Sequence, residues 1–295
     1  MYHVGLLSLL LTDPRTLLDA HNCYPYDGKF ADRIERALAT GVPVAIEQDL
    51  AWSVDHSVLS HETKTTGREP LMKEYFFERI RPLIEKELKE KKHRKDWPLV
   101  VLNLDFKTNE PEHHRAVWKL LGEYEAWLTT ARKTKDAARV SKLKMKPVLV
   151  LTGSPDVQQQ VYFDDVAVGG KLRVFGAVAN GKDLPGKATN YRRWWNNPWA
   201  MVEEGGQRKA GDWTADDLAR LQMLVRHAHG NGLWIRFYTL NGHPEAQSEG
   251  MTPSYNFGSL EAAKARWEAC LATGVDFVAT DQYEEFSVVQ KSARR

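Results

Sequence analysis

Short apolar runs alternate with amphipathic segments along almost the whole chain. The runs are rich in Val, Leu and Ile, a composition typical of buried β-strands. We expect strands over 16–21, 42–49, 98–105, 146–152, 171–177, 233–239 and 275–280, with a further short strand within 191–199. Between the runs, apolar residues recur at helical spacing, which predicts helices over 29–40, 69–92, 111–132, 214–229 and 259–273.

Strand followed by helix, repeated about eight times, predicts an α/β fold in which a parallel sheet is covered by helices. Eight such units in 295 residues favour a closed (β/α)8 barrel of the TIM type over an open sheet. No glycine-rich phosphate loop follows any of the runs, which argues against a nucleotide-binding fold. Because no linker or internal repeat interrupts the pattern, we expect a single domain over 16–295.

Residues 1–15 stand apart from this pattern. The apolar stretch 4–11 is typical of the core of a secretory signal, but no positive charge precedes it. We therefore expect either an N-terminal extension packed on the barrel or the remnant of a signal segment, and both a secreted and a cytoplasmic location stay open. No apolar run is long enough for a transmembrane helix.

Composition narrows the class of partner. Lys and Arg total 41 against 39 Asp and Glu, a balance that argues against general nucleic-acid binding. The two cysteines, Cys23 and Cys270, are too few and too far apart to form a disulfide framework or a thiolate metal site. The sequence carries no information on oligomeric state.

Three carboxylates fall at the ends of two predicted strands. Glu47 and Asp49 end the run 42–49, and Asp105 ends the run 98–105. Residues two apart in a strand share a face, and the carboxyl ends of barrel strands form the active face. Oxygen ligands without thiolates suit a hard cation, so these residues predict a site for Mg²⁺ or Ca²⁺.

Two histidines and a lysine accompany these carboxylates. His21 closes the run 16–21, His61 follows the carboxylate pair, and Lys107 lies two residues beyond Asp105. Imidazole titrates near neutral pH, so one histidine can deprotonate a nucleophile while the other protonates a leaving alkoxide. Lys107 can neutralise charge on a phosphoryl group. We therefore expect phosphodiester chemistry, with the two histidine roles unassigned and the nucleophile either water or a substrate hydroxyl.

Four further residues are weaker candidates for substrate binding. They are Asn22, Asn103, Tyr238 and Trp195. Trp195 belongs to a tryptophan-rich segment beside two arginines, which, if exposed, would suit a choline-like cation or peripheral contact with a membrane surface. The alternative is that this segment packs over the barrel mouth.

Two alternative functions stay open at this point. The charged residues could form structural ion pairs in a non-catalytic binding barrel, or the metal could serve a hydrolase of another bond type. A metal requirement for turnover distinguishes an enzyme from a binding module, and a transition metal would favour the other hydrolase.

Several of these motifs, in this order, resemble the phospholipase-C-like phosphodiesterase superfamily. The resemblance rests on Glu47-x-Asp49, on His61, on Asp105-x-Lys107 and on the segments 228–241 and 274–281. This superfamily includes glycerophosphodiester phosphodiesterases and sphingomyelinase-D-type phospholipases. The resemblance implies a TIM barrel acting on a phospholipid or glycerophosphodiester-like substrate.

The same resemblance implies roles for single residues. Glu47, Asp49 and Asp105 would be the metal ligands, His21 and His61 the acid–base pair, and Lys107 the phosphate contact. This chain departs from the glycerophosphodiester pattern in having His21-Asn-Cys23 where His-Arg-Gly is usual, and Asp105 where glutamate is common. Both departures favour the sphingomyelinase-D-like and phosphatidylinositol-phospholipase-like branches.

Overall fold

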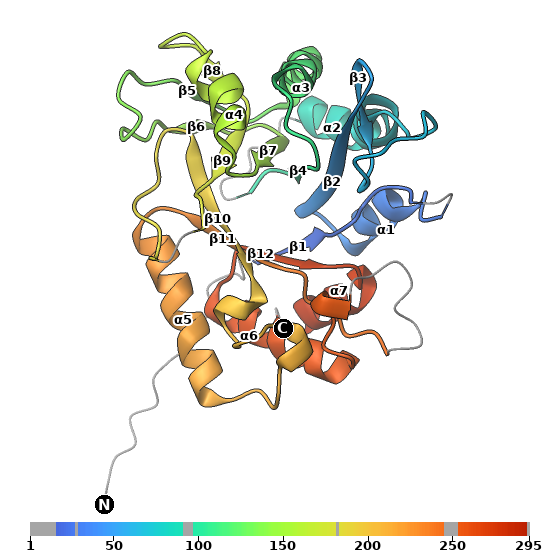
Figure 1. Ribbon diagram of the computed structural model, residues 1–295, viewed down its shortest axis with the longest axis vertical. Coiled ribbons are helices and arrows are strands. Elements are labelled where there is room, and N and C mark those ends of the chain that lie inside the picture. Colours follow the sequence, from blue (N-terminus) through green and yellow to red (C-terminus); the bar gives the residue numbers. More distant parts are fainter. Residues whose placement is uncertain (1–15, 27–28, 91–96, 181–182, 245–252, 294–295) are drawn as a thin grey trace, which may run out of the picture.

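The computed structural model describes residues 16–26, 29–90, 97–180, 183–244 and 253–293. Eight parallel strands form its centre: β1 (Leu17–Ala20), β2 (Val44–Ser53), β4 (Val100–Phe106), β7 (Val148–Thr152), β9 (Phe175–Ala177), β10 (Arg192–Pro198), β11 (Trp234–Tyr238) and β12 (Phe277–Thr280). Strand β1 pairs with both β12 and β2, so the sheet closes on itself (Figure 1). The predicted (β/α)8 barrel is confirmed.

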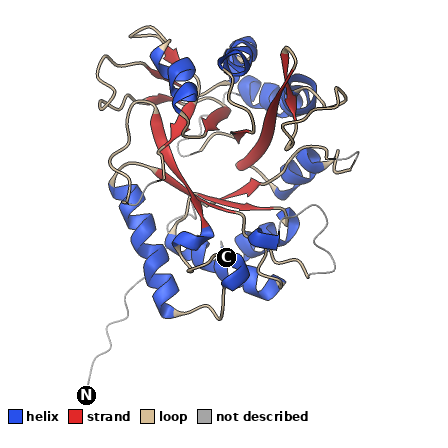
Figure 2. Cartoon of the chain, viewed as in Figure 1, coloured by secondary structure: helices blue, strands red, loops and turns tan. Residues whose placement is uncertain are grey.

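Helices cover the outside of the strands (Figure 2). The α-helices are α1 (Arg33–Thr40), α2 (Glu78–Glu90), α3 (Pro111–Glu123), α4 (Asp156–Gln159), α5 (Ala215–Gly230), α6 (Leu260–Thr273) and α7 (Tyr283–Ala293). Shorter helical turns are η1 (Lys73–Phe77), η2 (Glu125–Trp127), η3 (Gln160–Asp164), η4 (Trp199–Met201), η5 (Gln207–Lys209) and η7 (Pro253–Tyr255). The final helix α7, which the sequence pattern did not predict, follows the last barrel strand directly.

Local chemistry sets the ends of the best-predicted helices. Thr214 caps α5 by accepting a hydrogen bond from the backbone of Asp217, whose side chain in turn accepts from the backbone of Thr214. Helix α6 ends at Gly274, which has φ 79°, a left-handed conformation that favours glycine. Both boundaries agree with the sequence prediction.

Strand β2 is longer than predicted. It continues past Asp49 to Ser53 and then folds back as β3 (His56–Leu59), which pairs with it antiparallel. Asp49 therefore lies within a strand rather than at its end. The turn at Val54 has φ 56° and is not marked by Gly, Asn or Pro, so the sequence contained no usual hairpin signal.

Two predicted elements are divided in the structure. Helix α3 stops at Glu123, and the chain after it forms β5 (Thr130–Arg132) where we expected more helix. The predicted strand 171–177 is split into β8 (Lys171–Leu172) and the barrel strand β9. With β6 (Leu143–Lys144), strands β5 and β8 form a small antiparallel sheet.

The tryptophan-rich segment is buried. Trp194, Trp195 and Trp199 are at most 2 % exposed, so the exposed aromatic patch considered from the sequence is wrong and packing is the outcome. The expected N-terminal extension over 1–15 lies outside the described residues. Within the described ranges, no helix has the length and apolarity needed to cross a membrane.

Gly176 on β9 packs tightly against a neighbouring aromatic ring. A Cβ atom there would lie 2.4 Å from a ring carbon of the buried Tyr191. We predict that Gly176→Ala lowers the free energy of unfolding by about 1–3 kcal/mol, because the ring has no room to move. Urea denaturation measures the change. Gly211→Ala is the control, since its Cβ would meet nothing within 4 Å. Equal stability of the two variants would contradict this packing.

Candidate active site

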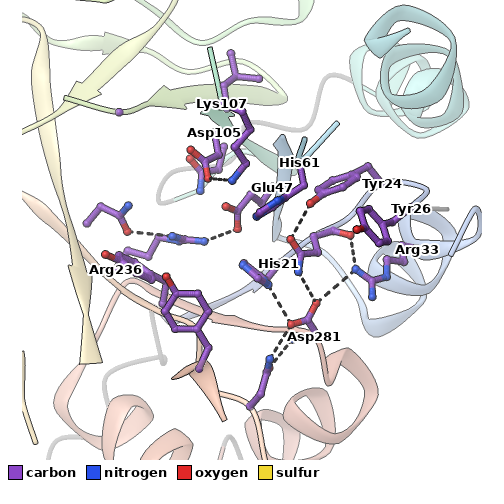
Figure 3. Close-up of a pocket in the computed structure, with 18 of the residues that line it drawn as sticks. His21, Tyr24, Tyr26, Arg33, Glu47, His61, Asp105, Lys107, Arg236 and Asp281 are labelled. Carbon is purple, nitrogen blue, oxygen red and sulfur yellow. Dashed lines mark hydrogen bonds and ion pairs between the residues drawn. The ribbon is translucent and has the colours of Figure 1, made fainter. Parts of the chain in front are cut away.

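A cavity of about 580 Å³ opens at the carboxyl ends of the barrel strands. Most of the residues predicted from the sequence line it: His21, Asn22, Glu47, His61, Asn103, Asp105, Lys107 and Tyr238. Asp49 lies beneath the cavity wall and is 1 % exposed. Figure 3 shows the labelled side chains, which come from strands, from the loops that follow them and from helix α1, gathered around the same space.

Strand register brings the three carboxylates together. Asp49 on β2 is the pairing partner of Asp105 on β4, and Glu47 lies two residues earlier on the same face of β2. One oxygen from each of the three side chains lies within 4.8 Å of the others. Residues far apart in sequence thus form one cluster that could hold a metal ion.

Lys107 bridges two members of this cluster. Its Nζ lies 2.7 Å from Oδ2 of Asp105 and 2.9 Å from Oδ2 of Asp49. Burial, followed by the charge of the neighbouring Asp105, raises the pKa of Asp49 to about 7 even though Lys107 opposes both. A bound metal cation, like Lys107, would favour the ionised form of Asp49.

The oxygens of Asp49 show that this cluster fits a cation. Oδ2 accepts a hydrogen bond from the Tyr24 hydroxyl at 2.7 Å and also faces Lys107. Oδ1 is buried and has no hydrogen-bond partner among the described residues. A buried carboxylate oxygen without a partner is costly, and a hard cation is the ligand that would satisfy it.

Arg236 on β11 lines the cavity, and the sequence analysis missed it. Its Nη2 donates to Oε2 of Glu47 at 2.6 Å, its Nη1 donates to Asn196 Oδ1 at 3.0 Å, and its Nε donates to Asp19. Burial raises the pKa of Glu47, and Arg236 is the main influence that lowers it. The sequence did contain a signal for this ion pair. The apolar run 16–21 contains one carboxylate, Asp19, and the apolar run 233–239 contains one cation, Arg236.

His21 is held by Asp281, a second residue that the sequence analysis left without a role. His21 Nδ1 lies 3.0 Å from Asp281 Oδ2, which also accepts from Asn241 Nδ2 at 2.7 Å. Burial lowers the pKa of His21, but the charges of Asp281 and Glu47 together outweigh it and raise the pKa to about 9. The His21 imidazole is therefore protonated at neutral pH.

His61 occupies the outer edge of the cavity. It follows β3, and the backbone N–H of the preceding Ser60 donates to the carbonyl of Asp49 at 3.1 Å. The side chain is 51 % exposed. Burial and the positive charge of Lys107 lower its pKa below the ordinary value of 6.5. The two histidines thus differ in protonation at neutral pH.

The weaker candidates separate into two groups. Asn22 Oδ1 lies 2.9 Å from the Tyr24 hydroxyl oxygen, Asn103 donates to Asp19 at 3.5 Å, and Tyr238 lies on the cavity wall. Trp195 is not among the lining residues, because its indole packs near His227 on the outer side of β10. Its neighbour Trp194 faces the cavity instead, as expected for alternate residues of a strand.

The pair formed by His21 and Asp281 leads to a test of the site electrostatics. We predict that Asp281→Asn lowers the pKa of His21 from about 9 by at least about one unit, because a negative charge is removed while burial remains. NMR titration of the imidazole measures this. Asp55→Asn is the matched control, since Asp55 pairs with the exposed His56. An unchanged His21 pKa in Asp281→Asn would show that Asp281 does not set its charge.

Comparison with solved structures supports the fold. No family model matches this chain, and no curated protein matches it in sequence. A solved glycerophosphodiester phosphodiesterase from Parabacteroides distasonis is 12 % identical over 96 % of this chain and 100 % of its own, with a TM-score of 0.53. A glycerophosphoryl diester phosphodiesterase from the same organism is 13 % identical over 95 % of this chain and 87 % of its own, with a TM-score of 0.46. The chain therefore has the barrel fold of a solved glycerophosphodiester phosphodiesterase, the fold that its motifs predicted.

Proposed function

We propose that this protein is a metal-dependent phosphoric diester hydrolase or lyase acting on a phospholipid or glycerophosphodiester-like substrate. One observation carries the proposal. One oxygen from each of three carboxylates on barrel strands lies within 4.8 Å of the others, and two histidines with opposite pKa shifts line the adjoining cavity. Likeness of fold to a solved phosphodiesterase supports it.

Glu47, Asp49 and Asp105 would hold the divalent ion, with Mg²⁺ or Ca²⁺ as the class that carboxylate oxygens select. When bound, such an ion supplies Lewis-acid stabilisation of charge on a phosphoryl oxygen and orients the phosphodiester. Asp49 would contribute the oxygen that lacks a partner among the described residues.

Two cations of the chain complete the electrostatic environment. Lys107 and Arg236 both line the cavity and are each paired with members of the carboxylate cluster. A metal ion bound to the carboxylates would neutralise them, so that Lys107 and Arg236 could interact with a substrate phosphate instead. Lys107 is the better placed of the two, since its side chain is 19 % exposed against 3 % for Arg236.

The difference between the histidines suggests their roles. His61, whose pKa is lowered, is neutral at pH 7 and would accept the proton of the nucleophile. His21, whose pKa is about 9, is protonated and would donate to the leaving alkoxide. Asp281 would keep the His21 ring in place. Water as nucleophile makes the protein a hydrolase, whereas a hydroxyl of the substrate makes it a lyase that forms a cyclic phosphate.

A non-catalytic binding barrel is the second candidate. It is favoured by the ion pairs already present, because Arg236 neutralises Glu47 and Lys107 bridges Asp49 and Asp105 without any added ion. Turnover that EDTA abolishes and Mg²⁺ or Ca²⁺ restores would exclude this candidate.

The histidine roles can be tested with two esters. Against an alkyl phosphodiester, His21→Ala and His61→Ala should each lower kcat by about 10²–10⁴. Against a p-nitrophenyl phosphodiester, His61→Ala should remain impaired, while His21→Ala should recover most of its loss because nitrophenolate leaves without a proton. Initial rates measure this difference.

His56→Ala is the control for these variants, since His56 is exposed and does not line the cavity. Equal losses on both esters for both variants would refute the assigned roles. Wild-type rates in both variants would refute phosphodiester catalysis by this pair.

Metal binding can be tested without activity. Isothermal titration calorimetry with Mg²⁺ and with Ca²⁺ should show binding to the wild type, weakened at least about tenfold in Asp49→Asn because a ligand charge is lost. Glu112→Gln, on the exposed start of α3, should bind as the wild type does. The proposed ligand set would be contradicted if neither ion gave a heat of binding. Equal affinity of Asp49→Asn and Glu112→Gln for the ion would contradict it as well.

A further inference from the structure

A strongly basic segment lies away from the candidate active site. Residues 132–146 contain seven Lys or Arg and one acidic residue, Asp136. The cations are Arg132, Lys133, Lys135, Arg139, Lys142, Lys144 and Lys146. Since the whole chain has a net charge of only +2, the remainder of the chain is net negative. Positive charge is thus concentrated in one short segment.

This segment forms a cleft at the other end of the barrel. It contains β5 and β6, and Leu128, just before β5, pairs with Val148 at the beginning of β7. The candidate site lies at the opposite, carboxyl ends of the strands. In Figure 1, β5, β6 and β8 lie together at the upper left. The cleft between 132–142 and 168–169 has a volume of about 590 Å³, and we call it the basic cleft.

The charges of the basic cleft are not compensated within the described parts of the chain. None of the seven cations forms an ion pair with a described carboxylate, whereas Arg36 and Arg81 on other surfaces do. Lys133 donates to the backbone carbonyl of Asp164 at 2.9 Å, an uncharged group. Asp136 accepts from the backbone N–H of Ala138 at 2.9 Å. Like charges held together repel each other, and an anionic partner relieves that repulsion.

Exposed apolar side chains indicate the kind of anionic partner. Val140 is 46 % exposed and Val168 is 64 % exposed, and both line the basic cleft. Among the described lining residues there is no aromatic side chain on which a nucleic-acid base could stack. Lys and Arg around exposed aliphatic side chains are the combination that binds anionic lipid headgroups and the acyl boundary beneath them.

We propose that the basic cleft docks the protein on an anionic membrane surface, with Val140 and Val168 entering the headgroup region and the surrounding cations contacting lipid phosphates. This surface is separate from the carboxylate cluster, so the proposal does not depend on the chemistry proposed there. The sequence had suggested membrane contact at the tryptophan-rich segment, which is buried. The contact proposed here lies instead at the end of the barrel opposite the candidate active site.

Vesicle co-sedimentation tests the proposal. The wild type should bind vesicles of phosphatidylcholine with 30 mol % phosphatidylserine about tenfold or more tightly than pure phosphatidylcholine vesicles, and added salt should weaken that binding. The triple variant Lys135→Ala, Arg139→Ala, Lys142→Ala should bind the anionic vesicles roughly a hundredfold more weakly, at about fivefold per removed charge. Val140→Asp should also weaken it.

The matched control removes three exposed cations elsewhere, in Arg208→Ala, Arg220→Ala, Arg226→Ala. Its net charge equals that of the first triple variant, and it should bind as the wild type does. Circular dichroism confirms that both variants are folded. The proposal is overturned if the wild type shows no preference for anionic vesicles, if the control loses as much as the test variant, or if a DNA duplex competes the protein off the vesicles.

Discussion

The arrangement of the candidate site depends on one buried ion network. Arg236 is 3 % exposed and contacts both Asp19 and Glu47, which themselves are buried inside the barrel. A lone charge in that environment would cost several kcal/mol, so the three side chains are stable only as a set. The set ties β11 to β1 and β2. It thereby holds Glu47 in the position from which the rest of the carboxylate cluster follows by strand register.

Electrostatic environment, rather than residue type, distinguishes the two histidines. His21 lies among carboxylates, with Asp281 in contact and Glu47 nearby, and its pKa rises despite burial. His61 faces Lys107 and its pKa falls. The same type of side chain therefore has a raised pKa at one position and a lowered pKa at the other, because the neighbouring charges differ in sign.

Periodicity in the sequence predicted the secondary structure and the faces that neighbouring residues share. It did not predict contacts between residues far apart in the sequence. The alternation of strands and helices identified the barrel, and spacing by two correctly paired Glu47 with Asp49. The contact between His21 and Asp281 joins residues 260 positions apart, which no periodicity reveals. Trp195 was a candidate for substrate binding, but it lies on the outer face of β10. The face that each residue of that strand occupies could not be read from residue types, and a shift of one residue reverses it.

The hairpin formed by β2 and β3 divides the candidate site into a part on the barrel strands and a part after the hairpin. The two parts differ in how well they tolerate changes of sequence and length. The carboxylates sit in the closed barrel, where each strand has neighbours on both sides. His61 instead follows an antiparallel strand that, in the described part of the chain, pairs with no strand other than β2. Changes in the segment that follows β3, where His61 and Glu62 line the cavity, would reshape its outer wall without disturbing the register of Asp49 with Asp105. The barrel can therefore keep one chemistry while the segment after the hairpin diversifies the molecules admitted to it.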